Sequence, residues 1–112
     1  MDDIVNPQDA ELEEIVLGAC LIESKAITLV AGILRPEVFY IEKNREIYAA
    51  LQSMYRVGQV IDLMTVKEEL TRRGKLDFIG GPYALVSITT RVASSAHLEY
   101  HARILQQKYI RR

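Results

Sequence analysis

The apolar positions of this chain recur with a helical period over nearly its whole length. Near the amino terminus, their spacing predicts an amphipathic helix whose buried face is made of Leu12, Ile15, Val16, Ala19 and Cys20. Asp9 precedes this face and is expected to cap the helix, because an aspartate side chain accepts hydrogen bonds from free N–H groups of the first turn. The pattern therefore places a half-buried helix at the start of the chain.

Prolines, glycines and an aspartate indicate where the next helices begin and end. A short helical segment is expected over about residues 24–33, and Pro36 prevents its continuation, because the residue before a proline is excluded from the helical region. A third helix is expected over about residues 42–57, and Gly58 is placed to end it. Asp62 then stands where a fourth helix would begin.

Three signals place the remaining helices. Gly74 is expected to end the fourth helix, and Pro82 opens a fifth. Ser94 or Ser95 can cap the last helix, over about residues 95–112. Apolar positions of these three helices again recur on one side of each: Leu63, Val66, Leu70, Leu85, Ile88, Leu98, Ala102, Leu105 and Tyr109.

Composition agrees with a single globular domain. The chain has 112 residues, of which 49% are hydrophobic and 26% charged, and a domain of this size buries roughly two-thirds of the surface of its unfolded chain. No strand-like alternation of useful length accompanies the helical pattern. We therefore expect an all-α fold, a compact orthogonal bundle of about six helices, with residues 1–8 as a flexible lead-in and residues 9–112 as the domain.

Charge is unevenly distributed along the chain. The net charge of −1 gives no overall basic field that would indicate nucleic-acid binding. Residues 1–23 nevertheless hold seven acids and no base, whereas residues 100–112 hold four bases and no acid. The last helix is thus the most basic part of the chain.

The single cysteine and the amino-terminal segment bear on location. Cys20 cannot form an internal disulfide, and on an apolar stripe it is expected to be buried as a small hydrophobic residue. The acidic amino terminus does not resemble a signal or transit peptide. No apolar run approaches the roughly 20 residues of a membrane span. A cytoplasmic location is expected.

The glycine-rich stretch "GKLDFIGGPYAL", residues 74–85, raises the question of a phosphate-binding loop. Such a loop needs G-x-x-x-x-G-K-[ST] after a strand, but here Leu76 follows the lysine and Glu69 stands at the first glycine's position. A helix cap at Gly74 and a connector held to the core by Leu76 and Phe78 account for the stretch instead. No cofactor site is expected.

His97 and His101 are four residues apart and share one face of the last helix, as zinc ligands on a helix do. Glu99, however, points about 160° away from His97 at 3.6 residues per turn. No further ligand is placed beside them by the sequence. Surface or packing histidines are the preferred interpretation, and neither a metal site nor a catalytic residue is expected.

Six segments occur in an order and at a spacing typical of one family: "ELEEIVLGACL" (11–21), "LRPEVFY" (34–40), "REIYAAL" (45–51), "GQVIDLMTVKEEL" (58–70), "GKLDFIGGPYAL" (74–85) and the final "SAHLEYHARILQQKYIRR". Over about residues 7–112 the chain resembles the N-terminal domain of DnaB-type replicative DNA helicases. His97 and Asn44 depart from residues common in that family and are expected to leave the core pattern untouched.

The resemblance implies a non-catalytic role. In such helicases this domain forms a collar on a hexameric ring, contributes to subunit association and takes part in binding the primase. The motor domain, which uses ATP and magnesium, lies further along the chain, and DNA is bound through the hexamer. The last helix would be the first half of a helical hairpin that is truncated at Arg112.

The end of the last helix is the candidate partner-binding surface. Ile104 and Ile110 fall off its inner stripe, and basic residues surround them. The candidate residues are Arg103, Ile104, Lys108, Tyr109, Ile110, Arg111 and Arg112. An alternative function remains open, an independent small helical nucleic-acid-binding domain, whose basic face would consist of Arg72, Arg73, Arg111 and Arg112.

Overall fold

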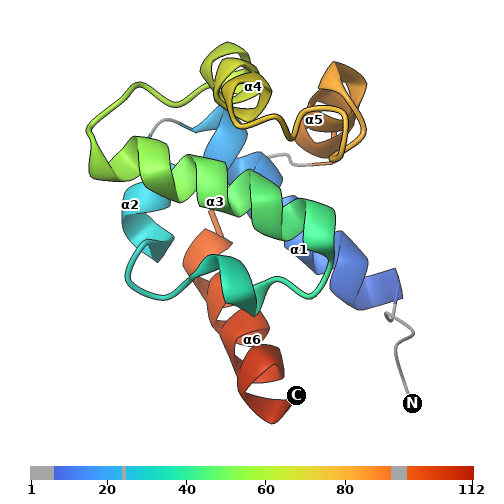
Figure 1. Cartoon of the computed structure of the whole chain (residues 1–112). Coiled ribbons are helices and arrows are strands. Elements are labelled where there is room, and N and C mark those ends of the chain that lie inside the picture. Colours follow the sequence, from blue (N-terminus) through green and yellow to red (C-terminus); the bar gives the residue numbers. More distant parts are fainter. Residues whose placement is uncertain (1–6, 24, 92–95) are drawn as a thin grey trace.

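The fold is built from helices alone in the residues that the structure, a computed structural model, describes: 7–23, 25–91 and 96–112 (Figure 1). The elements are α1 (Pro7–Ile22), α2 (Ala26–Val30), the 3₁₀ helix η1 (Pro36–Val38), α3 (Glu42–Arg56), α4 (Leu63–Arg72), α5 (Pro82–Thr89) and α6 (Leu98–Arg111). The prediction of an all-α bundle of six helices is confirmed within these ranges. None of the described helices has the length and apolar character needed to cross a membrane.

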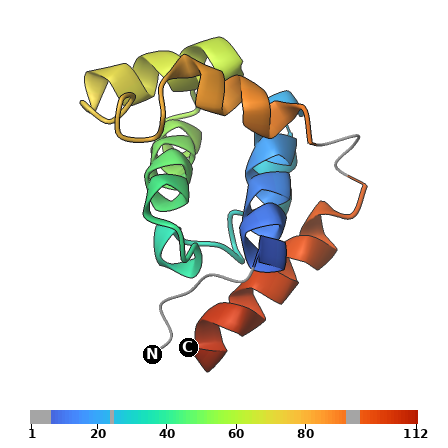
Figure 2. The same cartoon turned by 90° about the vertical axis from the view of Figure 1, so that its right-hand side faces the viewer.

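Helix α1 lies at the centre of the bundle and contacts each of the other five α-helices. It runs beside α3, α5 lies across one end of the pair, and α6 crosses α1 on its other side (Figure 2). This position explains a difference from the prediction of one buried face. Leu17 and Leu21 are buried along with Val16 and Cys20, because neighbours cover the carboxyl-terminal half of α1 on several sides.

The ends of α3 and α4 lie close to where local signals placed them. Gly58 and Gly74 have φ angles of 71° and 73°, the left-handed conformation that favours glycine after a helix. Asp62 caps α4, because its carboxylate accepts a hydrogen bond from the Thr65 N–H at 2.9 Å. The Thr65 hydroxyl in turn accepts one from the Asp62 N–H at 2.9 Å, which completes a reciprocal cap.

Other helix ends differ from expectation. Helix α1 begins at Pro7, so Asp9 lies in its first turn, where a negative charge is favoured by the helix dipole, rather than at the cap. Helix α2 is confined to Ala26–Val30. Helix α6 begins at Leu98, and the predicted serine caps at 94 and 95 lie outside the described residues.

Residues 74–81 of the glycine-rich stretch connect α4 to α5, and its last four residues begin α5. Leu76 packs against the core as expected, but the expectation for Phe78 was wrong, because its side chain is half exposed. Ile79, which is buried, takes its place. The reason is one helical turn closed by the Ile79 N–H and the Lys75 carbonyl at 3.1 Å. Residues three apart share a side of such a turn, so Leu76 and Ile79 face the core together.

Candidate partner-binding surface

The surface predicted from the sequence forms the carboxyl-terminal half of α6. Of the two isoleucines on this surface, Ile110 is the more exposed, with 71% of its surface accessible. Ile104 is only partly exposed. Tyr109 packs its ring against the core. The exposed apolar part of this surface is therefore smaller than the pattern indicated, and Ile110 accounts for most of it.

Two bases of this surface have acidic partners, which come from outside residues 100–112. Arg103 lies 3.1 Å from the carboxylate of Glu99 on the preceding turn. Lys108 lies 3.0 Å from Asp9, which α1 brings to the side of α6. Such exposed pairs contribute little to stability, about 0–1 kcal/mol each. Their consequence is electrostatic, since they leave Arg111 and Arg112 as the bases of α6 without an ion pair in the described parts of the chain.

Arg112 joins the end of α6 to the segment around η1. Its Nη2 donates a hydrogen bond to the Val38 carbonyl at 2.8 Å. Its guanidinium lies 5.0 Å from the ring centre of Tyr40 and 5.5 Å from that of Tyr109. Arg35 lies 5.6 Å from the Tyr109 ring centre as well. Arginine and tyrosine side chains thus follow one another in an alternating row, which joins two segments that are some seventy residues apart in sequence.

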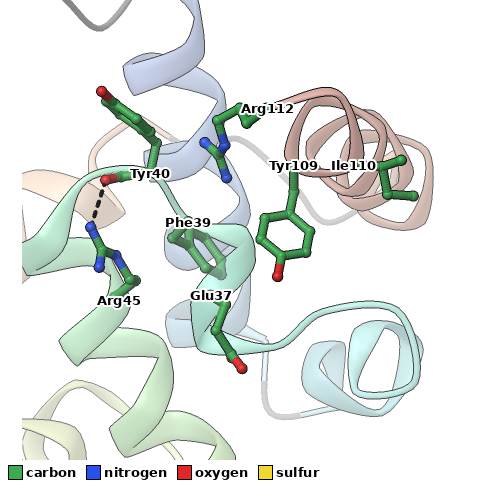
Figure 3. A pocket seen from close by; sticks show the side chains of 7 residues that line it. All are labelled: Glu37, Phe39, Tyr40, Arg45, Tyr109, Ile110 and Arg112. Carbon is green, nitrogen blue, oxygen red and sulfur yellow. Dashed lines mark hydrogen bonds between the residues drawn. The ribbon is translucent and has the colours of Figure 1, made fainter. Parts of the chain in front are cut away.

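A groove of about 530 Å³ lies beside this contact (Figure 3). We call it the η1 groove, and its lining residues are Glu37, Phe39, Tyr40, Arg45, Tyr109, Ile110 and Arg112. The α6 side of this groove was predicted from the sequence, but the rest of its lining was not. The only signal for the other side was the segment "LRPEVFY", and nothing in the sequence pairs that segment with the last helix.

Glu13 of α1 supports the η1 groove from beneath. Its side chain is only 1% exposed. The carboxylate accepts hydrogen bonds from the N–H groups of Tyr40 at 2.6 Å and Ile41 at 3.3 Å, and from Asn44 Nδ2 at 2.9 Å. Ile41 precedes α3, so Glu13 places a negative charge at the positive end of that helix. Asn44 is fully buried, which corrects the expectation that it leaves the core untouched.

Burial raises the pKa of Glu13 above its ordinary value of 4.5, and the hydrogen bonds from Asn44, Tyr40 and Ile41 oppose that change. The charge of Arg112 also acts to lower this pKa. Glu13 is thus an electrostatic link between the core and the end of α6. The acidic run around it in the sequence gave no reason to single it out.

The arginines of α4 lie elsewhere. Arg72 and Arg73 bind the same carboxylate, that of Glu69, at 2.7 and 3.0 Å. The hydrogen bonds from Arg72 and Arg73 lower the pKa of Glu69. Helices α4 and α6 make no contact, and in Figures 1 and 2 they occupy opposite ends of the molecule. The four arginines of the alternative function therefore do not form one continuous face.

His97 and His101 lie with their ring centres 6.3 Å apart, edge to face. Within the described ranges, no group of three or more His, Cys, Asp and Glu side chains is arranged to hold a metal ion. The expectation that the chain has no metal site stays a prediction.

The fold defines the chain as a small all-α domain of crossed helices around a central one. The family model of the DnaB-like helicase N terminal domain matches residues 5–107, and the chain belongs to this family.

Relatives of known sequence and structure support the same family assignment. The chain is 47% identical over 108 residues to the replicative DNA helicase DnaB of Rhodothermus marinus, which covers 96% of this chain and 12% of that protein. It is 36% identical over 112 residues to the replicative DNA helicase DnaC of Bacillus subtilis, over 100% of this chain and 25% of that protein. The crystal structure of the N-terminal domain of DnaB helicase from Mycobacterium tuberculosis matches with a TM-score of 0.88 and 38% identity, over 95% of this chain and 77% of that one.

Proposed function

We propose that this chain is the non-catalytic N-terminal domain of a hexameric replicative DNA helicase, where it serves subunit association and primase binding in the cytoplasm. One observation carries the proposal. The chain spans 12% and 25% of two relatives that are named replicative DNA helicases. The ATP- and magnesium-dependent motor, and with it the binding of DNA through the hexamer, is assigned to the remainder of such a protein.

The carboxyl-terminal half of α6 is the surface proposed for association. Ile110 offers exposed apolar area, and Arg111 is an exposed base beside it. An apolar centre with a charged rim is the usual composition of a protein–protein contact. Because Tyr109 packs against the core, the test relies on Ile110 alone.

Analytical ultracentrifugation tests the role of this helix. The 112-residue chain is expected to be monomeric or weakly dimeric, and a longer chain that includes the segment following α6 is expected to associate more tightly. Ile110→Asp should weaken that association without unfolding the domain, whereas Val57→Asp, at an equally exposed position away from α6, should leave it unchanged. A tight dimer that Ile110→Asp does not affect would place association on another face.

Two further measurements separate this function from its alternatives. Calorimetry of the chain with Mg-ATP should show no binding, because residues 74–81 form a connector and not a phosphate loop. A salt titration with single- and double-stranded DNA tests the nucleic-acid-binding alternative, since phosphate contacts weaken steeply as salt rises. Tight, salt-sensitive DNA binding by the chain alone would favour that alternative.

A further inference from the structure

The η1 groove contains a buried hydrogen-bond donor without an acceptor. Arg45 projects from the first turns of α3, and its Nη2 donates to the Tyr40 carbonyl at 3.0 Å. Its Nε–H is also buried and has no hydrogen-bond partner among the described residues. A buried donor left unpaired costs free energy, and an arginine fork is shaped to bind both oxygens of a carboxylate. The Nε–H is too buried for a partner to reach it as the side chain stands, so the group that Arg45 can offer to an acidic ligand is Nη1, which has no hydrogen bond among the described residues.

Arg112 supplies a second guanidinium on the other side of the groove. A guanidinium carries five N–H donors, and the structure assigns a hydrogen bond only to Nη2 of Arg112 within its described ranges. The remaining donors are held in place by the rings of Tyr40 and Tyr109. In Figure 3, Arg112 lies above Phe39 and Arg45 lies to its left. Two lining residues of the groove, Arg45 at Nη1 and Arg112, thus have unused donors.

The charges of the groove favour an anion. Glu37 is its one acidic lining residue, against Arg45 and Arg112, and Figure 3 shows the Glu37 carboxylate directed away from Arg112. Arg35 adds a further positive charge at the Tyr109 ring. No carboxylate of the described residues makes an ion pair with Arg45 or Arg112. The lining of the groove consequently carries a net positive charge, which the buried Glu13 beneath it offsets only in part through Arg112.

We propose that the η1 groove binds an acidic segment of a partner protein, with a carboxylate of that segment held by Arg45 and Arg112. Apolar side chains beside the carboxylate would lie against Tyr109 and Ile110. This inference deepens the proposed function, on which it rests, by stating the chemistry of one partner segment.

A nucleotide or a single strand of nucleic acid fits the groove less well. Proteins bind such strands by stacking the bases on the faces of aromatic side chains. Here the Tyr109 ring already stacks with Arg35 and Arg112, and the Tyr40 ring with Arg112. What the groove still offers is hydrogen-bond donors, and a carboxylate can use them without displacing either ring contact.

Binding of an acidic peptide tests the proposal on the 112-residue chain itself. The probe is a short fluorescein-labelled peptide that alternates glutamate and serine around a central leucine. A matched peptide carries glutamine in place of glutamate, and an oligothymidine of similar length is the third probe. Fluorescence anisotropy at low salt should show binding of the glutamate peptide, weaker binding as salt rises, and none of the glutamine peptide.

Nitrogen-edited NMR of the unmodified chain locates the bound peptide. The buried Arg45 Nε–H is protected from solvent, so its signal should be observable and should shift when the glutamate peptide is added. This readout needs no variant and is unaffected by any loss of folding.

Variants then assign the contact to the two arginines. Arg45→Gln and Arg112→Gln should each weaken glutamate-peptide binding by about tenfold or more, the expected loss of a hydrogen-bonded charge pair. Arg56→Gln is the matched control on α3, since Arg56 is exposed and lies outside the groove. Circular dichroism confirms that each variant is folded.

Three outcomes would overturn the proposal. They are equal binding of the glutamine peptide, an Arg45 signal that does not respond, and tighter binding of oligothymidine that the same two variants abolish. The last result would assign the groove to nucleic acid. Because these measurements do not depend on self-association, they can fail while the ultracentrifugation test of the proposed function succeeds, and the reverse.

Discussion

Removal of the Glu13 carboxylate is expected to be among the most destabilising single changes at a polar position of this domain. Glu13→Ala leaves three donors without their acceptor: the N–H groups of Tyr40 and Ile41, and Asn44 Nδ2. Each buried donor left unpaired costs about 1–3 kcal/mol. Tyr40 and Ile41 are only half-buried, so water can replace part of what is lost, and removal of a buried charge recovers some desolvation free energy. We expect a net loss of about 2–4 kcal/mol.

Glu13→Gln is the matched comparison. The new amide oxygen can take the place of Oε2 and still accept from the Tyr40 N–H, whereas the Ile41 N–H, which is only half-buried, exchanges its acceptor for water. Asn44 Oδ1 is buried and has no hydrogen-bond partner in the described structure, so the new amide nitrogen can donate to it once the Asn44 amide turns over. The expected loss is about 1 kcal/mol or less. A difference between the two variants would show that hydrogen bonding, rather than charge, is the main contribution of Glu13.

The pH dependence gives an independent check. Because burial raises the pKa of Glu13 above 4.5, the folded state keeps this proton at pH values where the unfolded state has lost it. The contribution of Glu13 to stability therefore falls as pH rises from 4.5 through the folded-state pKa, and is constant above it. Glu13→Gln cannot titrate, so its stability relative to the wild type should improve over that window.

Urea unfolding followed by circular dichroism, repeated at pH values from 4.5 upward, measures both effects. A Glu13→Ala variant that stays within about 0.5 kcal/mol of the wild type, the range of an ordinary surface substitution, would show that these hydrogen bonds contribute little to stability. A stability difference between wild type and Glu13→Gln that does not change with pH would contradict the raised pKa of Glu13.

Three other predictions concern local features. Asp62→Ala should lower the free energy of unfolding by about 1 kcal/mol in urea titrations, because it removes the α4 cap. Gly74→Ala should cost about 1–2 kcal/mol on account of its φ of 73°, whereas Gly32→Ala, with open space and no positive φ, should be neutral or slightly stabilising; equal effects would contradict this. The Cys20 thiol, whose pKa burial raises to about 12, should react with a disulfide reagent only after unfolding.

The features that could be predicted from the sequence are those with local causes. The α4 cap depends on Asp62 and Thr65, three residues apart, and the ends of α3 and α4 depend on single glycines. A helical period likewise identifies residues that share a face without any knowledge of what covers them. Fold class and most of the core follow from such signals.

The remaining features depend on distant contacts. Glu13 binds Asn44 across 31 residues, and Arg112 binds the Val38 carbonyl across 74 residues. No spacing rule relates positions so far apart. The candidate surface was consequently recognised only on α6, and its opposite wall was missed. Likewise, Lys108 and Asp9 come from the two segments of opposite charge, but their pairing required the fold to bring α1 beside α6.

The central position of α1 has a consequence for the order in which the protein opens. No other α-helix can detach without exposing part of α1, but partial opening of any one of them leaves α1 covered by the rest. Its backbone amides between Val16 and Leu21 should therefore exchange with solvent deuterium only when the whole domain unfolds. Segments near a chain terminus usually exchange first, whereas here the slowest exchange is expected close to the amino terminus.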